Sequence, residues 1–195
     1  MTYFDVTMQH SEESLYALSH MQYDLFCTRN FIARSLLSLC LVGAGAYFFA
    51  RVWGIFLLAY GCYLLTSTYS SANYTVRKLL EQLRAAGQPL PSSRYRFEDS
   101  QIAITYHPGR EDEEELAPVA YRELLRLGED NRYYYLFPSA SGGYCVPKDA
   151  LGEEKQAFAA FLEEKTGQRF YRRRPSPLRR VQEWLKKRAD EPIHL

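Results

Sequence analysis

The chain has 195 residues, of which 47% are hydrophobic, 15% aromatic and 24% charged, and its net charge is +1. This apolar content excludes a disordered chain, and 11 Gly and four Cys exclude collagen-like and disulfide-scaffold proteins. The near-neutral total hides an uneven distribution, because residues 31–70 contain only two charged side chains while residues 166–195 carry a net charge of +6.

Apolar and polar residues alternate near the N-terminus, which predicts a short strand over Thr2–Met8 with Phe4, Val6 and Met8 on one face. Ser11, followed by two glutamates, predicts the start of a helix. The strand has no partner nearby, so we expect it to pair with a sheet formed later in the chain. Residues 1–30 would then belong to the same domain as that sheet.

Residues 31–50 and 52–70 are two apolar segments, each about as long as a membrane-spanning helix. Arg34 lies near the start of the first segment, and Arg51 lies between the two among aromatic residues that favour the lipid headgroup level. We therefore predict a two-helix transmembrane hairpin over residues 31–70. The alternative is a hairpin buried in a soluble core, but the rest of the chain offers too little apolar surface to bury it.

Basic residues are more numerous at the outer ends of the predicted hairpin than at its turn, which places both termini in the cytoplasm. The flanking bases are Arg29, Arg34, Arg77, Lys78 and Arg84. The first 30 residues lack the apolar core of a secretory signal peptide, so we expect the first span to direct insertion. The four cysteines follow no metal-binding spacing, and we expect them to be unpaired and reduced.

After the second span, residues 71–90 predict a juxtamembrane helix that ends at Gly87. The pattern then changes to alternation, which predicts a small antiparallel β-rich domain over residues 91–168. The predicted strands are Arg94–Glu98, Gln101–Tyr106, Glu115–Tyr121, Glu123–Leu127, Arg132–Phe137 and Gly143–Pro147, with turns at 107–109 and 128–131. A final helix is predicted over Leu151–Thr166, with Gly167 at its end.

Residues 169–195 form a basic tail, in which an amphipathic helix is predicted over Leu178–Ala189. The candidate lipid- or partner-contacting residues are Arg179, Arg180, Trp184, Lys186, Lys187 and Arg188. Two positions for the tail stay open: it lies on anionic lipid, or it docks on the acidic β-rich domain. No nucleic-acid partner is expected, because the protein is held at a membrane.

The sequence contains no catalytic motif. Its four histidines are scattered, and it has neither a GKS or GKT phosphate loop nor a GxSxG elbow. Gly43–Ala46 lies inside a predicted span, where small residues favour close helix packing. The acidic run Glu111–Glu115 lacks the spacing of a calcium loop. We therefore predict that the protein is not an enzyme and uses no cofactor or metal.

The order and spacing of these segments resemble the YcxB-like family of bacterial membrane proteins over roughly residues 3–168. The matching residues are Tyr95–Asp99, Ile102, Ile104, Val119–Tyr121, Leu124, Leu125, Tyr133–Phe137, Tyr144–Lys148, Phe158, Phe161 and Leu162. The resemblance implies a membrane protein with a domain similar to pleckstrin-homology folds, and it implies no enzymatic activity. Pro147-Lys148 is its local signature, a strand end that leads into the final helix, and Lys148 is a candidate ligand-contacting residue.

We thus expect an α+β protein of the bacterial inner membrane whose cytoplasmic, pleckstrin-homology-like domain is a binding or regulatory module for a protein or a lipid headgroup. The alternative is an immunity protein that protects the membrane against a secreted toxin, and an adjacent toxin gene would favour it. Transport is a third possibility. It would require a homo-oligomer, since Arg34 is the single charge inside the two spans.

Overall fold

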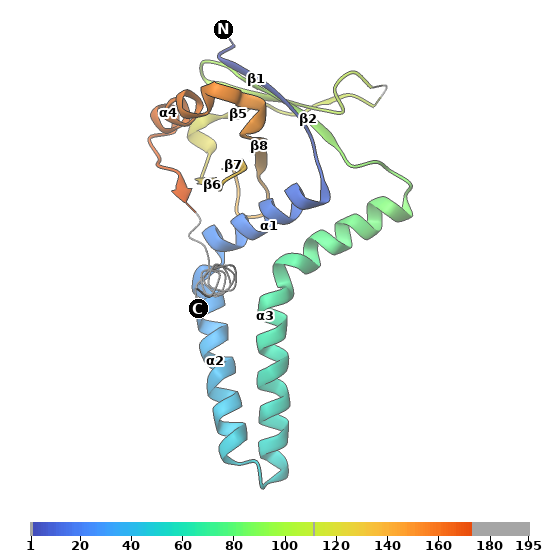
Figure 1. Ribbon diagram of the computed structural model, residues 1–195, viewed down its shortest axis with the longest axis vertical. Helices are drawn as coiled ribbons and strands as arrows, with labels where there is room; N and C mark the ends of the chain where they lie inside the picture. The colour runs from blue at the N-terminus through green and yellow to red at the C-terminus, as the bar shows by residue number, and fades with distance from the viewer. Residues whose placement is uncertain (1, 111, 173–195) are drawn as a thin grey trace, which may run out of the picture.

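The computed structural model describes residues 2–110 and 112–172, and it shows an α+β protein. Residues 2–26, 92–110 and 112–172 form a domain of strands and helices, here called the head. It lies at one end of a long helical hairpin over residues 28–85 (Figure 1). In chain order, the elements are β1 (Phe4–Gln9), α1 (Glu12–Phe26), α2 (Thr28–Tyr47), α3 (Val52–Ala85), β2 (Ser92–Phe97), β3 (Gln101–Tyr106), β4 (Glu114–Glu115), β5 (Val119–Ala120), the 3-10 helix η1 (Tyr121–Glu123), β6 (Arg126–Glu129), β7 (Tyr133–Phe137), β8 (Tyr144–Pro147), the 3-10 helix η2 (Asp149–Glu154), α4 (Lys155–Thr166) and β9 (Tyr171–Arg172).

Two sheets form the head domain. The first has the order β1-β2-β3-β4, with β5 also paired to β3, and the second has the order β8-β7-β6-β9. Within the described residues, neighbouring strands are antiparallel except β6 and β9, which run parallel. The prediction of an antiparallel β-rich domain followed by a helix is therefore confirmed.

The N-terminal strand belongs to the first sheet. β1 pairs with β2 along its whole length, with Val6 opposite Tyr95. Val6 and Met8 are 2% and 5% exposed, so the face predicted to be apolar is buried. The expected pairing is confirmed, and the hairpin of α2 and α3 is inserted between two adjacent strands of one sheet (Figure 1).

The core of the head is closed by α4 on one side and by α1 on the other. Phe158 of α4 is fully buried, and its ring packs edge-on against Phe97 of the first sheet, with centroids 4.8 Å apart. The same ring lies 5.3 Å from Tyr134 of the second sheet, so one side chain joins both layers. Met21 of α1 covers Gly128 of β6, where a Cβ atom would lie 2.9 Å from the Met21 side chain.

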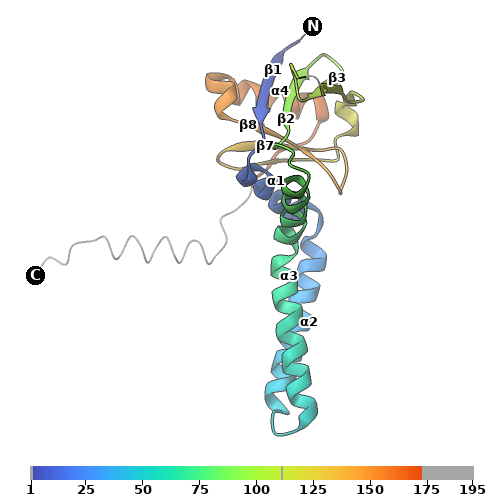
Figure 2. The same cartoon turned by 90° about the vertical axis from the view of Figure 1, so that its right-hand side faces the viewer.

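The helices α2 and α3 lie side by side in both views (Figures 1 and 2). A Cβ atom on Gly45 would lie 2.5 Å from the backbone nitrogen of Leu58, so only glycine permits this approach. The Ser38 hydroxyl also donates a hydrogen bond of 2.8 Å to the carbonyl of Gly61. The predicted role of the small residues in helix packing is thus confirmed at Gly45, whereas Gly43 faces open space.

The two helices differ in their capacity to cross a membrane. Among the described residues, α2 is the one helix that is long and apolar enough by itself. α3 is long and apolar enough to cross a membrane only when its two segments, Val52–Thr68 and Ser70–Ala85, are counted together, and these segments meet at an angle of 58°. The predicted two-helix transmembrane hairpin is therefore not confirmed. The juxtamembrane helix predicted over residues 71–90 corresponds to the part of α3 beyond the bend, Ser70–Ala85, and the helix ends just before Gly87, whose φ is +64°.

The bend in α3 has a local cause. Hydroxyl groups on either side of it donate to carbonyls of the same helix, from Thr68 to Leu64 at 2.7 Å and from Ser71 to Thr68 at 3.0 Å. Such side-chain contacts compete with the backbone ladder and bend helices. A hydropathy pattern does not detect this effect, so the sequence analysis did not locate the bend.

Several predicted boundaries in the head are wrong. Glu115–Tyr121 is not one strand, because Pro118 has no N–H to donate, and two short strands, β4 and β5, stand in its place. The strand predicted over Glu123–Leu127 begins only at Arg126, after η1, and it includes Gly128 and Glu129, which had been assigned to a turn. The last helix is divided by Gly152, whose φ of +52° interrupts it.

Candidate functional site

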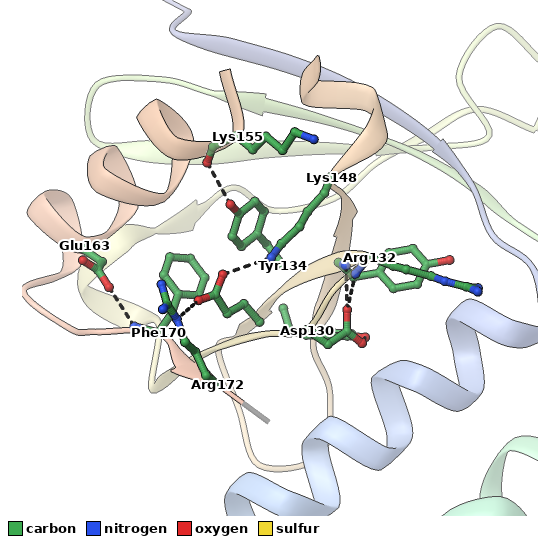
Figure 3. A network of polar contacts seen from close by, with 11 residues as sticks. Asp130, Arg132, Tyr134, Lys148, Lys155, Glu163, Phe170 and Arg172 are labelled. Atoms are coloured by element: carbon green, nitrogen blue, oxygen red, sulfur yellow. Dashed lines mark hydrogen bonds and ion pairs between the residues drawn. The ribbon is translucent and has the colours of Figure 1, made fainter. Parts of the chain in front are cut away.

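A network of charged side chains lies at the edge of the second sheet. Glu129, whose side chain is 11% exposed, binds two cations at once. One carboxylate oxygen accepts a hydrogen bond from Lys148 Nζ at 3.0 Å, and the other accepts from Arg172 Nε. Lys148 and Arg172 approach from opposite sides (Figure 3). The Lys148 ammonium also lies 4.4 Å from the centre of the Tyr134 ring, which adds a cation–π contact.

The strands of the second sheet position these groups. Glu129 is the last residue of β6 and faces Tyr134 of β7 on one side and Arg172 of β9 on the other. Lys148 follows the last residue of β8, so the predicted strand end at Pro147 is confirmed. The β6–β7 turn is held by Asp130, whose carboxylate accepts hydrogen bonds from the backbone N–H groups of residues 132 and 133 at 2.8 Å (Figure 3).

This arrangement determines how the candidate residue Lys148 can act. Its side chain is only 16% exposed and its ammonium is engaged by Glu129, so it ties β8 to β6 inside the structure. Arg172 is 85% exposed and uses only Nε in its contact with Glu129, which leaves the rest of its guanidinium facing solvent. The three side chains Glu129, Lys148 and Arg172 are here called the clasp, because they hold the strands of the second sheet together. Arg172 is the member whose cation is accessible to solvent.

Two buried groups of the head, the Cys145 thiol and the Tyr134 phenol, are not activated by their surroundings. The four cysteines are unpaired, and Cys145, in β8, is fully buried. Burial raises the pKa of the Cys145 thiol, which therefore stays protonated and unreactive. Burial likewise raises the pKa of the Tyr134 phenol, and its hydroxyl donates to the carbonyl of Lys155 at 2.8 Å (Figure 3). Residues 2–110 and 112–172 contain no group of three or more His, Cys, Asp or Glu placed to hold a metal ion.

Two hollows lie near the junction of the head and the hairpin. The first, here called the foot groove, has a volume of about 350 Å³. It is lined by Asp24, Leu25, Arg126, Leu127, Gln168, Arg169 and Tyr171. The second, about 570 Å³, lies between α1 and the bend of α3, and every side chain that lines it carries a hydroxyl group. These residues are Tyr23, Tyr63, Thr66, Ser67, Ser70, Ser71, Tyr74 and Thr75.

The sequence located only part of these features. It singled out Lys148 but missed Glu129, which meets Lys148 and Arg172 only through the pairing of the strands. It also missed Arg126 and Arg169, which line the foot groove together with α1. The candidate tail residues Arg179, Arg180, Trp184, Lys186, Lys187 and Arg188 lie outside the described residues. Comparisons with family models, with curated proteins and with solved structures gave no match to this chain.

Proposed function

We propose that the chain is a non-enzymatic protein of the bacterial inner membrane, in which a two-helix transmembrane hairpin anchors a cytoplasmic binding or regulatory domain. The observation that carries this proposal is the apolar surface of the hairpin. Large apolar side chains on both helices are between 52% and 65% exposed, namely Ile32, Leu36, Leu37, Leu39, Ile55 and Phe56. Water would disfavour so large an apolar surface, whereas lipid tails would cover it.

The dimensions of the hairpin support the same proposal. The 20 residues of α2 extend for about 30 Å, which equals the thickness of the hydrocarbon core. Val52–Thr68 extends for about 26 Å, near the short end of the range for a span. At the turn between the helices, the side chains of Tyr47, Phe49 and Trp53 are 83%, 60% and 78% exposed. Aromatic rings favour the headgroup level of a membrane, so this turn would lie at the surface of the far leaflet.

The bend supports a cytoplasmic position for the head. Beyond it, α3 turns by 58° and packs Ala72, Val76 and Leu80 out of solvent. Ser19 of α1 fixes this segment by donating to the carbonyl of Ala72 at 2.9 Å. The lysine and arginine side chains of Ser70–Ala85 would then lie along the membrane surface, where cytoplasmic loops are enriched in positive charge.

For the head, we propose a pleckstrin-homology-like binding domain. Two antiparallel sheets with α4 packed against both support this assignment. A binding role suits a domain whose polar groups are arranged as a structural clasp and whose accessible cations, such as Arg172, lie on its surface. The ligand would be a protein or a lipid headgroup.

Alkaline carbonate extraction of membranes tests the anchor. We expect the protein to remain in the pellet, and release into the supernatant would overturn the proposal. A matched pair of variants locates the membrane-facing surface: Leu39→Arg in α2 and Leu125→Arg in the head, which replace leucines of 59% and 53% exposure. An arginine near the centre of a span costs about 2.5–3.5 kcal/mol, so only Leu39→Arg should raise the extracted fraction.

Topology is tested by fusing to the C-terminus a fluorescent protein that matures only in the cytoplasm. The proposal requires a fluorescent fusion, because the head follows the second span. A well-expressed but dark fusion would place the head on the other side of the membrane.

A further inference from the structure

We propose that the foot groove binds the phosphate group of an anionic membrane lipid. The inference rests on the membrane insertion proposed above and assigns a ligand to one surface of the head. It is carried by three observations: the position of the groove, the charge of its lining, and the apolar wall beside that charge.

The groove lies at the level where lipid headgroups would be. Asp24 and Leu25, which line it, belong to the last turn of α1. α1 ends at Phe26 and α2 begins at Thr28, so the groove is within one helical turn of the proposed span. The base of the head lies directly above the start of α2 (Figure 1). A lipid beside α2 could therefore place its phosphate in the groove without leaving the bilayer.

Two arginines give the groove its affinity for anions. Arg126 and Arg169 line it and are exposed, and neither has an ion-pair partner within the part of the chain that the structure describes. By contrast, Arg94 is paired with Asp5, and Arg132 with Glu13. A guanidinium without a carboxylate partner offers a planar fork of donors that matches the oxygens of a phosphate group.

The total charge of the lining favours a phosphodiester. Asp24 also lines the groove, so two arginines and one aspartate leave an excess of one positive charge. A lipid phosphodiester, such as that of phosphatidylglycerol, carries one negative charge. Leu25, which is half-buried, forms the apolar wall on which the glycerol backbone and the first methylene groups could lie, whereas Leu127 is 1% exposed and belongs to the core. The lining therefore suits a phosphate that is attached to an apolar chain.

Native mass spectrometry of the full chain in detergent, with equal amounts of phosphatidylglycerol and phosphatidylcholine, tests this proposal. We expect the wild type to retain phosphatidylglycerol preferentially. Each arginine near a lipid surface should contribute about fivefold, so Arg126→Gln combined with Arg169→Gln should reduce the preference about 30-fold. The matched control is Arg110→Gln combined with Arg122→Gln, which removes two exposed arginines that do not line the groove.

The control should keep the wild-type preference. If the groove variant kept it too, or if the control lost as much, the assignment to this groove would be wrong. Inorganic phosphate at constant ionic strength should fail to displace the lipid, and displacement would assign the groove to a soluble phosphate compound instead. All three chains are also washed with carbonate. Retention in the pellet without any lipid preference would refute this inference alone, whereas release of the wild type would refute the membrane anchor.

Discussion

The substitution Glu129→Gln would remove the charge that holds Lys148 and Arg172 against the second sheet while it preserves the size of the side chain. The ammonium of Lys148, whose side chain is 16% exposed, would then face the Tyr134 ring without a counter-ion. Removing one partner of a buried ion pair costs about 3–5 kcal/mol. Because some water reaches this pair, we expect the free energy of unfolding to fall by about 2–3 kcal/mol.

An exposed pair in the same domain provides the control. Glu13 binds Arg132 with side chains that are 66% and 63% exposed, and we expect Glu13→Gln to cost less than about 1 kcal/mol. Lys148→Met removes the other partner of the buried pair. Combined with Glu129→Gln, it should cost less than the sum of the two single substitutions by about 1 kcal/mol or more, since neither variant group is left as an unpaired charge.

Urea unfolding of the full chain in detergent micelles, followed by the near-ultraviolet circular dichroism of the buried tyrosines, measures these differences. The stabilising role of the buried ion pair would be refuted by equal losses for Glu129→Gln and Glu13→Gln. It would also be refuted if the effects of Glu129→Gln and Lys148→Met were additive, because the clasp would then contribute no coupling.

Three further predictions concern other parts of the chain. Burial lowers the pKa of His10 below 6.5, so folding favours its neutral ring. The free energy of unfolding should therefore be highest above about pH 6.5 and fall as the pH drops below that value. His10→Gln should flatten this dependence in melting curves recorded against pH. Gly45→Ala should destabilise the hairpin by about 1–3 kcal/mol in thermal melts of the helical signal, whereas Gly43→Ala should not. Residues 90–172 produced without β1 should aggregate, because the edge of β2 and the surface that covers Val6 are then exposed. A soluble monomer in gel filtration would contradict the prediction that the head needs β1 to fold.

The architecture could be predicted where a pattern extends over many residues. Residues 31–70 are so poor in charge that both helices of the hairpin were found, and the alternation of β1 was strong enough to predict its remote partner. The capping hydroxyl at Ser11 and the left-handed Gly167 also marked helix ends correctly, since each depends on one residue and its neighbours. These signals are local, so the sequence contains them in full.

The candidate sites could not be predicted, because they depend on tertiary neighbours. Glu129 is 19 positions from Lys148 and 43 from Arg172, and no spacing rule joins them. β9 contains only Tyr171 and Arg172, too few residues to form a pattern, and it pairs in parallel with β6. The foot groove likewise combines α1, β6 and the segment after α4. Only the assembled fold shows which of the many arginines lack a partner.

The insertion of the hairpin between β1 and β2 also has a consequence for the order of events during protein synthesis. His10 and Ser93, which form a hydrogen bond at the ends of these strands, are 83 positions apart. At about 5–20 residues per second, a ribosome needs about 4–17 s to make the intervening segment. During that interval β1 has been made but its partner β2 has not, while the apolar hairpin, for which we proposed membrane insertion, is already complete. If the hairpin is inserted as proposed, membrane integration begins before the head can close, because β2 is made after both helices of the hairpin.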